Sequence, residues 1–142
     1  MQSEMKSENE VKKEYLSRYG KALQAEKVIQ EEIQQLRLDK MCPSIMQDGM
    51  PHGNAGSGDL SGYMAKMDEL LEDLKQQMEK RLQIMKGIIR DIERMKNETE
   101  KTVLRLRYIH LLKWEEIALK MGYSWKQIHR IHGKALKNFK MT

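Results

Sequence analysis

Cysteine is almost absent from this sequence, which contains Cys42 alone. A single cysteine excludes an intrachain disulfide framework, and it leaves no second thiolate for a cysteine-rich metal site. No stretch approaches the roughly 18 consecutive apolar residues that a membrane-spanning helix needs. The first residues also lack the basic and then apolar pattern of a secretory signal peptide. These absences favour a cytoplasmic protein with no membrane partner.

Aromatic residues are also scarce, at 6% of the 142 residues. Most of them fall near the C-terminal end, at Tyr108, Trp114, Tyr123, Trp125 and Phe139. With 39% hydrophobic and 33% charged residues, the chain is able to bury only a thin core. We therefore expect its one compact core near the C-terminus.

The excess of positive charge lies in the same segment. Residues 100–142 carry ten Lys and Arg against three Asp and Glu, a net charge of +7. The other 99 residues carry 16 basic and 18 acidic groups, a net charge of −2, which gives +5 for the chain. A localised cluster of cations attached to a nearly neutral segment is typical of proteins that bind nucleic acid.

Prolines and glycines gather in one stretch and leave two long segments free of helix breakers. Residues 42–62 hold both prolines and most of the glycines, so they predict a loop or linker. From Val11 to Lys40, apolar residues recur every three or four positions, which predicts a helix with one seam that Glu26 interrupts. From Tyr63 to Lys96, a heptad pattern predicts a second helix.

The heptad pattern of the second helix is rich in methionine. One heptad position holds Met64, Leu71, Met78, Met85 and Ile92, and the other holds Met67, Leu74, Ile88 and Met95. At this spacing we interpret the methionines as core rather than as a soft-metal site. The two helices are expected to fold back on each other as a hairpin, or to pair across a dimer interface as a coiled-coil arm.

Three short helices are predicted after the arm, at Glu98–His110, Trp114–Met121 and Trp125–Lys140. Asn97 and Glu100 have capping-box spacing at the start of the first. Gly122 suits the left-handed residue that ends the second, and Ser124 with Gln127 suits a capping box at the start of the third. This order, a helix, a short turn and a second helix, predicts a helix-turn-helix domain over residues 97–142, after an arm of residues 1–96.

The third short helix has one apolar face and one polar face. Its apolar face is formed by Ile128, Ile131, Ala135, Leu136 and Phe139. The residues expected to contact DNA are Trp125, Lys126, Gln127, His129, Arg130, Lys134 and Lys137. Arg130 suits a guanine edge and Gln127 suits an adenine, whereas the lysines suit phosphates. Double-stranded DNA is therefore the expected partner.

The same segment resembles region 4 of bacterial sigma-70 factors. The resemblance covers roughly residues 98–140 and rests on three runs, residues 102–109, 114–118 and 128–137. It implies a helix-turn-helix that reads promoter DNA through Trp125, Lys126, His129 and Arg130, and that also contacts RNA polymerase. Residues 1–95 contain only three tyrosines and no other aromatic residue, so they lack the aromatic surface with which sigma region 2 holds melted DNA.

The order of the segments along the whole chain resembles late-gene activators of the ArpU and RinA type, from phages and prophages of Gram-positive bacteria. The resemblance implies a phage-encoded transcription regulator, and the arm implies a homodimer. Two alternatives remain open: an assembly protein such as a small subunit for phage DNA packaging, and a module that binds RNA polymerase without binding DNA. Stoichiometry and DNA binding distinguish the three.

No catalytic constellation, cofactor or metal site is expected. His129 and His132 lie three residues apart, but no carboxylate or thiolate stands at supporting spacing. Residues 53–58 are rich in glycine but lack the Lys-Ser/Thr pair of a phosphate loop. Cys42 precedes Pro43 and has no evident histidine partner for nucleophilic chemistry. The sequence therefore predicts an all-α DNA-binding protein that is not an enzyme.

Overall fold

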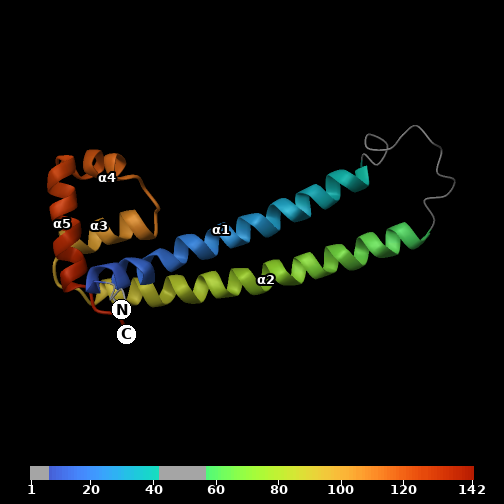
Figure 1. Cartoon of the computed structure of the whole chain (residues 1–142), viewed down its shortest axis with the longest axis horizontal. Coiled ribbons are helices and arrows are strands. Elements are labelled where there is room, and N and C mark those ends of the chain that lie inside the picture. The colour runs from blue at the N-terminus through green and yellow to red at the C-terminus, as the bar shows by residue number, and fades with distance from the viewer. Residues whose placement is uncertain (1–6, 42–56) are drawn as a thin grey trace, which may run out of the picture. The chain divides into compact units, whose positions relative to one another are not determined.

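The computed structural model describes residues 7–41 and 57–142, and every regular element in these ranges is an α-helix (Figure 1). The helices are α1 (Glu8–Met41), α2 (Ser57–Glu93), α3 (Glu98–Tyr108), α4 (Trp114–Met121) and α5 (Trp125–Asn138). The prediction of an all-α chain, with a helical hairpin followed by three short helices, is confirmed.

The predicted boundaries differ from the observed ones chiefly at the loop. Because α2 begins at Ser57, the prediction that residues 57–62 belong to the loop is wrong. The heptad pattern begins only at Met64, and the two glycines at positions 58 and 62 obscure the first turns of the helix. Cys42, His52 and most of the glycine-rich run at 53–58 lie outside the described residues.

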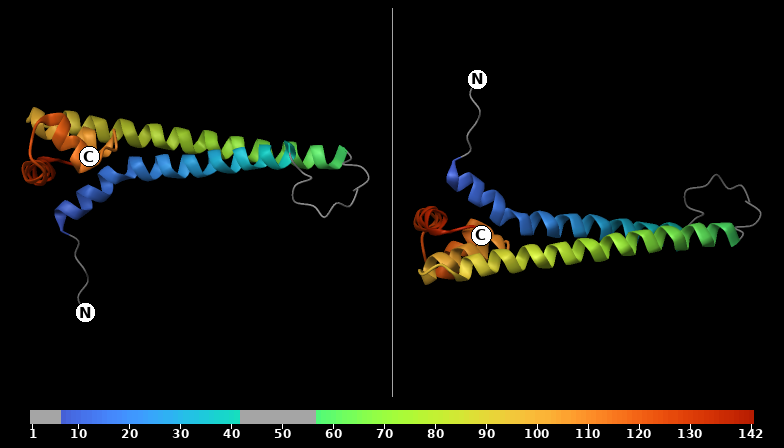
Figure 2. Two further views of the ribbon diagram at one scale, coloured as in Figure 1. Left: turned by 90° about the horizontal axis from the view of Figure 1, so that it is seen from above. Right: turned by 90° about the horizontal axis from the view of Figure 1, so that it is seen from below.

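Compactness divides the chain into two units, one of residues 23–80 and one that combines residues 1–22 with residues 81–142. Within each of these two units, the parts of α1 and α2 that belong to it run antiparallel, side by side (Figure 2). In the unit of residues 23–80, Ile33 is buried and the Lys40 ammonium lies 5.6 Å from the ring centre of Tyr63. Glu26, predicted to interrupt the seam of α1, is itself buried.

The methionine-rich stripe of α2 follows its predicted role as core only in part. Met64, Leu71 and Met78 are 55%, 43% and 38% exposed, so the described residues of one chain do not bury them. Met67 and Leu74, at the other heptad position, are partly buried. Only beyond residue 80 does the pattern enter a core, where Ile88, Ile92 and Met95 are buried.

The second unit joins the start of α1 and the end of α2 to the three short helices. One hydrophobic cluster takes residues from α1, α2, the turn between α2 and α3, α3, α5 and the segment that follows α5. Its buried members are Leu16, Tyr19, Ile88, Ile92, Met95, Leu104, Tyr108, Ala135, Leu136 and Phe139. The short helices therefore share their core with the hairpin, and the compact unit does not begin at residue 97.

No helix among the described residues is both long enough and apolar enough to cross a membrane.

Candidate nucleic-acid interface

Local capping fixes the turn between α4 and α5. Gly122 ends α4 in the left-handed region, with φ 73° and ψ 28°, and the N–H of Tyr123 donates to the Ala118 carbonyl at 3.0 Å. Glycine adopts this conformation without the steric cost that a Cβ would bring. The Ser124 hydroxyl accepts from the Gln127 N–H at 3.1 Å, and Gln127 Oε1 accepts from the Ser124 N–H at 3.0 Å. The predicted turn and capping box are thus both confirmed.

The start of α3 follows its prediction only in part. Asn97 accepts from the Glu100 N–H at 3.0 Å, as predicted. The Glu100 carboxylate, however, accepts from Asn138 Nδ2 at 2.7 Å, instead of returning to the Asn97 backbone. Glu100 is 6% exposed, so this bond satisfies a buried acid and joins the start of α3 to the end of α5.

A second hydrophobic cluster sets α5 against α4 and α3. It consists of Val103, Leu106, Ile117, Ala118 and Ile128. Three of these side chains, Val103, Ile117 and Ile128, are fully buried. Because Ile128 lies on the first turn of α5, its burial holds the start of that helix against α4. The opposite side of the same turn is left at the surface.

That surface carries most of the residues predicted to bind DNA. Six of the seven are exposed, namely Trp125, Lys126, Gln127, Arg130, Lys134 and Lys137. Trp125 is 57% exposed, which is high for so large an apolar side chain. Gln127 already uses its Oε1 in the capping box, so reading adenine with both ends of the amide would require it to leave the cap.

His129, the seventh predicted residue, lies between two tryptophan rings and is only partly exposed. Its ring centre is 4.0 Å from that of Trp125 and 4.7 Å from that of Trp114. Arg107 lies over the Trp114 ring, with its guanidinium carbon 4.5 Å from the ring centre. Among the described residues nothing bonds to the buried Nε2 of His129. The main contact of His129 is therefore with the Trp125 ring, and only part of its side chain reaches the surface.

His132 is a buried residue that the sequence analysis did not place in the core. Its Nε2 and the Tyr108 hydroxyl are 2.8 Å apart and share a hydrogen bond. Burial, aided by electrostatic contributions from Lys13, His129 and Arg107, lowers the pKa of His132 to about 4, and burial raises the pKa of Tyr108 to about 12. Both groups are therefore neutral near pH 7. The signal was available, because His132 follows Ile128 by four residues and precedes Ala135 by three.

Helix α1 caps the C-terminal end of α5, a contact that sequence reasoning missed. The ammonium of Lys12 donates to the carbonyls of Leu136 and Lys137, at 2.8 Å and 3.3 Å. It also lies 3.3 Å from the Glu8 carboxylate, and Lys12 is 5% exposed. The last carbonyls of a helix lack intrahelical partners and carry partial negative charge, so a buried cation stabilises them.

Asp91 joins α1, α2 and the last residues of the unit. Its carboxylate accepts from the Tyr15 hydroxyl at 2.7 Å, and from the Thr142 hydroxyl and N–H at 2.6 Å and 3.4 Å. Burial alone would raise the pKa of Asp91, but the bonds from Thr142 and Tyr15 outweigh it, so the pKa is lowered. The carboxylate is therefore ionised near pH 7 and serves as a structural acceptor.

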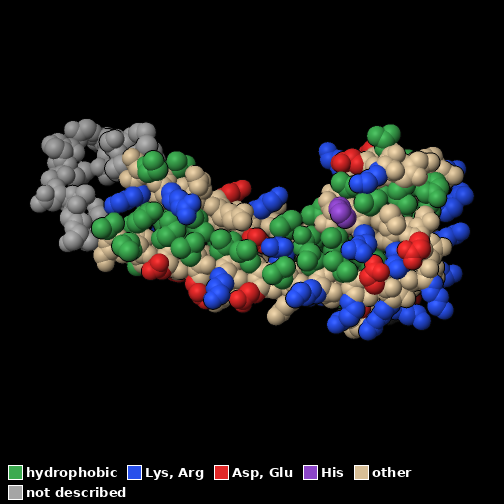
Figure 3. Space-filling model, turned by 180° about the vertical axis from the view of Figure 1, so that it is seen from behind, with side chains coloured by type: hydrophobic (Ala, Val, Ile, Leu, Met, Phe, Trp, Pro, Cys, Tyr) green, Lys and Arg blue, Asp and Glu red, His purple; other side chains and the backbone are tan. Residues whose placement is uncertain are grey.

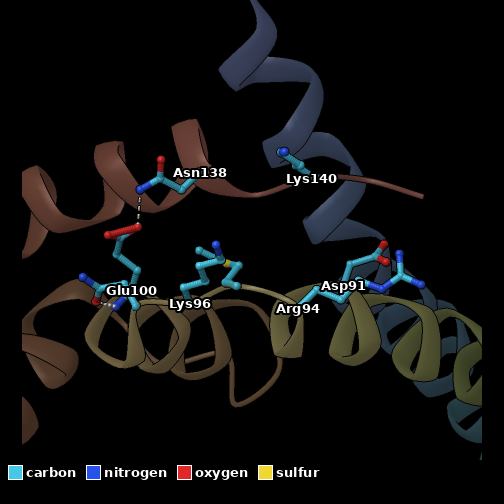
Figure 4. Close-up of a pocket in the computed structure, with 8 residues that line it drawn as sticks. Asp91, Arg94, Lys96, Glu100, Asn138 and Lys140 are labelled. Atoms are coloured by element: carbon cyan, nitrogen blue, oxygen red, sulfur yellow. Dashed lines mark hydrogen bonds between the residues drawn. The ribbon is translucent and has the colours of Figure 1, made fainter.

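A cleft of about 470 Å³ opens between the end of α2, the start of α3 and the end of α5 (Figure 4). It is lined by Asp91, Arg94, Met95, Lys96, Asn97, Glu100, Asn138 and Lys140. Its two carboxylates already accept internal hydrogen bonds. The three cations make no ion pair within the described part of the chain, so they add to the basic surface of the unit.

The geometry of α4 and α5 defines a helix-turn-helix, a class of DNA-binding module. Residues 97–140 match the family model described as Sigma-70, region 4. The match covers α3, α4 and α5, and it indicates a role in DNA binding and transcription through a module that is not itself catalytic. The chain matches no curated protein and no solved structure.

Proposed function

We propose that this protein is a sequence-specific, DNA-binding transcription regulator that acts at promoters through α5. The observation that carries the proposal is the exposed first half of α5, where Trp125, Lys126 and Arg130 stand clear of the core. In helix-turn-helix proteins the second helix enters the major groove, and its N-terminal residues contact base edges. The match to Sigma-70, region 4, supports this role.

The proposed contacts follow from where each side chain lies on α5. Arg130 lies six residues after Ser124 and is exposed. We assign it to a guanine edge, because its guanidinium group is able to donate two parallel hydrogen bonds. Lys126, Lys134 and Lys137 are assigned to phosphates, because an ammonium on a flexible stem contributes charge more than direction. Trp125 offers an apolar face at the first turn, which suits a thymine methyl group.

The wider setting of the proposal rests on the resemblances and on the arm. The regulator would work in the cytoplasm on phage genes, as a homodimer through the α1/α2 hairpin, and would contact RNA polymerase near the promoter. A two-fold dimer predicts two half-sites in its DNA target, related by the same symmetry. Low exposure of His129 suggests that it contributes to binding through the position of Trp125.

Selection from a random pool of duplexes at about 150 mM salt tests the proposal, because non-specific binding is weak at that salt concentration. We expect enrichment of one site with two related halves. On that site Arg130→Ala should cost about 1–3 kcal/mol of binding free energy and relax the choice of base at one position. Arg37→Ala, an exposed arginine on α1 far along the sequence from the helix-turn-helix, is the matched control and should leave affinity unchanged.

The remaining outcomes separate the alternatives. Lys137→Ala should weaken binding to all duplexes alike and reduce the salt dependence by about one ion. No enrichment, with retained binding to RNA polymerase, would refute DNA reading and favour a module that binds only the polymerase. A ring of eight or more copies in light scattering would favour packaging of DNA over regulation.

A further inference from the structure

Five large apolar side chains on α2 face solvent although they lie on a long, well-formed helix. They are Leu60, Met64, Leu71, Met78 and Leu82, with exposed fractions of 50%, 55%, 43%, 38% and 40%. We refer to these five residues as the α2 outer stripe. Single exposed apolar residues are ordinary, but a continuous row of them marks an interaction surface. Figure 3 shows hydrophobic side chains gathered along the surface of the α1/α2 pair.

The α2 outer stripe is straight and narrow. At about 100° of rotation per residue, its members fall within a sector of roughly 40° on the helix. Partly buried residues lie on the neighbouring sector, among them Met67, Leu70 and Leu74. The stripe is therefore the outer margin of the apolar face of α2, and the described residues of a single chain leave its side chains about half exposed.

The order of residues in the stripe is the same from either end. Leucine and methionine alternate, Leu-Met-Leu-Met-Leu, and the intervals are four, seven, seven and four residues. Leu71 is the centre of this palindrome. A two-fold axis at Leu71, perpendicular to the helix, would place each residue opposite its counterpart on an antiparallel copy. Leu71 would meet Leu71, and Met64 would meet Met78.

The charges beside the stripe obey the same symmetry. Asp68 and Lys75 lie on one flank of the stripe, on the side away from Met67 and Leu74, and both are exposed. In an antiparallel pair related by a two-fold axis, the same flank of each helix faces that of its partner. Asp68 is three residues before Leu71 and Lys75 is four after it, so each Asp68 would lie within about one residue of Lys75 on the second copy. In a parallel pair the axis would run along the helices and place the two copies of Asp68 on opposite sides of the interface, so Asp68 and Lys75 of the two chains would not meet.

We infer that the α2 outer stripe binds a second copy of this chain, with the two α2 helices antiparallel about Leu71. The partner is a second copy because the palindrome and the paired charges are properties that only a self-complementary, two-fold interface uses. The inference specifies the dimer of the proposed function and rests on it in that respect. All of its tests are made without DNA, so their failure would leave the assignment of α5 to DNA untouched.

The mass of the full chain in solution is the first test. Each chain has a mass of 16.8 kDa, and light scattering should give about twice that value. Leu71→Glu places two carboxylates against each other at the centre of the interface and should weaken the dimer by about two orders of magnitude or more. Leu38→Glu, an exposed leucine on α1, is the matched control and should remain dimeric. A monomeric parent protein, or equal loss in both variants, would overturn the inference.

Cysteine cross-linking determines the direction of the pair. In a Cys42→Ser background, Leu71→Cys should form an intermolecular disulfide on mild oxidation, because the two copies of residue 71 lie on the axis. Met64→Cys alone should not cross-link, whereas a mixture of Met64→Cys and Met78→Cys chains should form the heterodimer. Efficient cross-linking of Met64→Cys to itself would show a parallel pair and refute the antiparallel register.

Exchange of the flanking charges tests the register independently of sulfur chemistry. Asp68→Lys should weaken the dimer several-fold, since it would face Lys75 of the second copy. Adding Lys75→Asp to the same chain should restore most of the loss. Circular dichroism should show the same helix content in the parent protein, the single variant and the double variant, so that weaker association is not mistaken for unfolding. Absence of restoration in the double variant would contradict the pairing.

Discussion

The cap that α1 places on α5 yields a quantitative prediction for Lys12→Met. Methionine keeps the unbranched stem and removes the ammonium, so the carbonyls of Leu136 and Lys137 lose the donor at 2.8 Å and 3.3 Å. Hydrogen bonds to charged groups contribute about 1.5–3 kcal/mol, and desolvation of the buried ammonium offsets part of that gain. We expect the free energy of unfolding to fall by about 2 kcal/mol.

The assay follows from the positions of the two tryptophans. Trp114 and Trp125 both lie in the helix-turn-helix, so their fluorescence during urea denaturation reports on the unit that contains the cap. A loss of about 2 kcal/mol corresponds to a fall in Tm of roughly 8–16 °C for a unit of this size. Lys21→Met removes an exposed lysine from the same helix and serves as the control.

Two results would refute the reasoning. Equal stability of the Lys12→Met variant and the parent protein would mean that the contact contributes no net free energy. An equal loss in the Lys21→Met variant would mean that the effect comes from the net charge of α1, not from the cap. A further comparison with Lys12→Arg, which keeps the charge but changes the shape of the donor, should give an intermediate loss.

Further predictions concern one titrating group and the turn chemistry. Because burial and nearby cations lower the pKa of His132 to about 4, the neutral histidine contributes up to about 3 kcal/mol to the free energy of unfolding. This contribution is complete above about pH 6.5 and is lost as the pH falls toward 4. Urea denaturation across this range should show the corresponding slope of stability with pH, and His132→Gln should flatten it. Gly122→Ala should cost about 1 kcal/mol, since φ is 73° and only the backbone conformation opposes a Cβ there. Gly133→Ala should stabilise by up to about 1 kcal/mol, because α5 has space for the methyl group and alanine favours helix. Ser124→Ala should cost about 1 kcal/mol through loss of the N-cap, and the opposite sign in any of these three would contradict the assigned role.

The features that the sequence predicts correctly are local ones. Gly122 and Ser124 act on backbone groups within a few residues of themselves, so their roles are visible in the order of residues alone. The same holds for the bounds of α4, which the structure places at Trp114 and Met121 as predicted. The start of α2 was missed because a glycine in the first turns of a helix resembles a glycine in a loop.

Contacts between distant residues were not predictable in the same way. Nothing in the spacing around Lys12 indicates that its ammonium reaches the end of α5, because that contact depends on how the hairpin returns to the short helices. The exposed residues at one heptad position of α2 show a related limit of what the sequence predicts. A pattern of Met64, Leu71 and Met78 indicates that an apolar face will be covered, but it does not say whether the cover comes from the same chain. For the same reason, the assignment of Trp125, Lys126 and Arg130 to DNA stays a prediction that the selection experiment must test.

The bond between Lys12 and Leu136 also bears on the order in which the protein acquires its structure, because it joins positions 124 residues apart. Three short helices with only local contacts would fold quickly, since little chain entropy is lost before the contacts form. Here the cap on the recognition helix requires closure of a loop that includes nearly all of the intervening chain. During synthesis, α1 and α2 are complete long before α5 leaves the ribosome. We therefore expect α5 to become fully ordered in the last step of folding, with the hairpin already formed as its template.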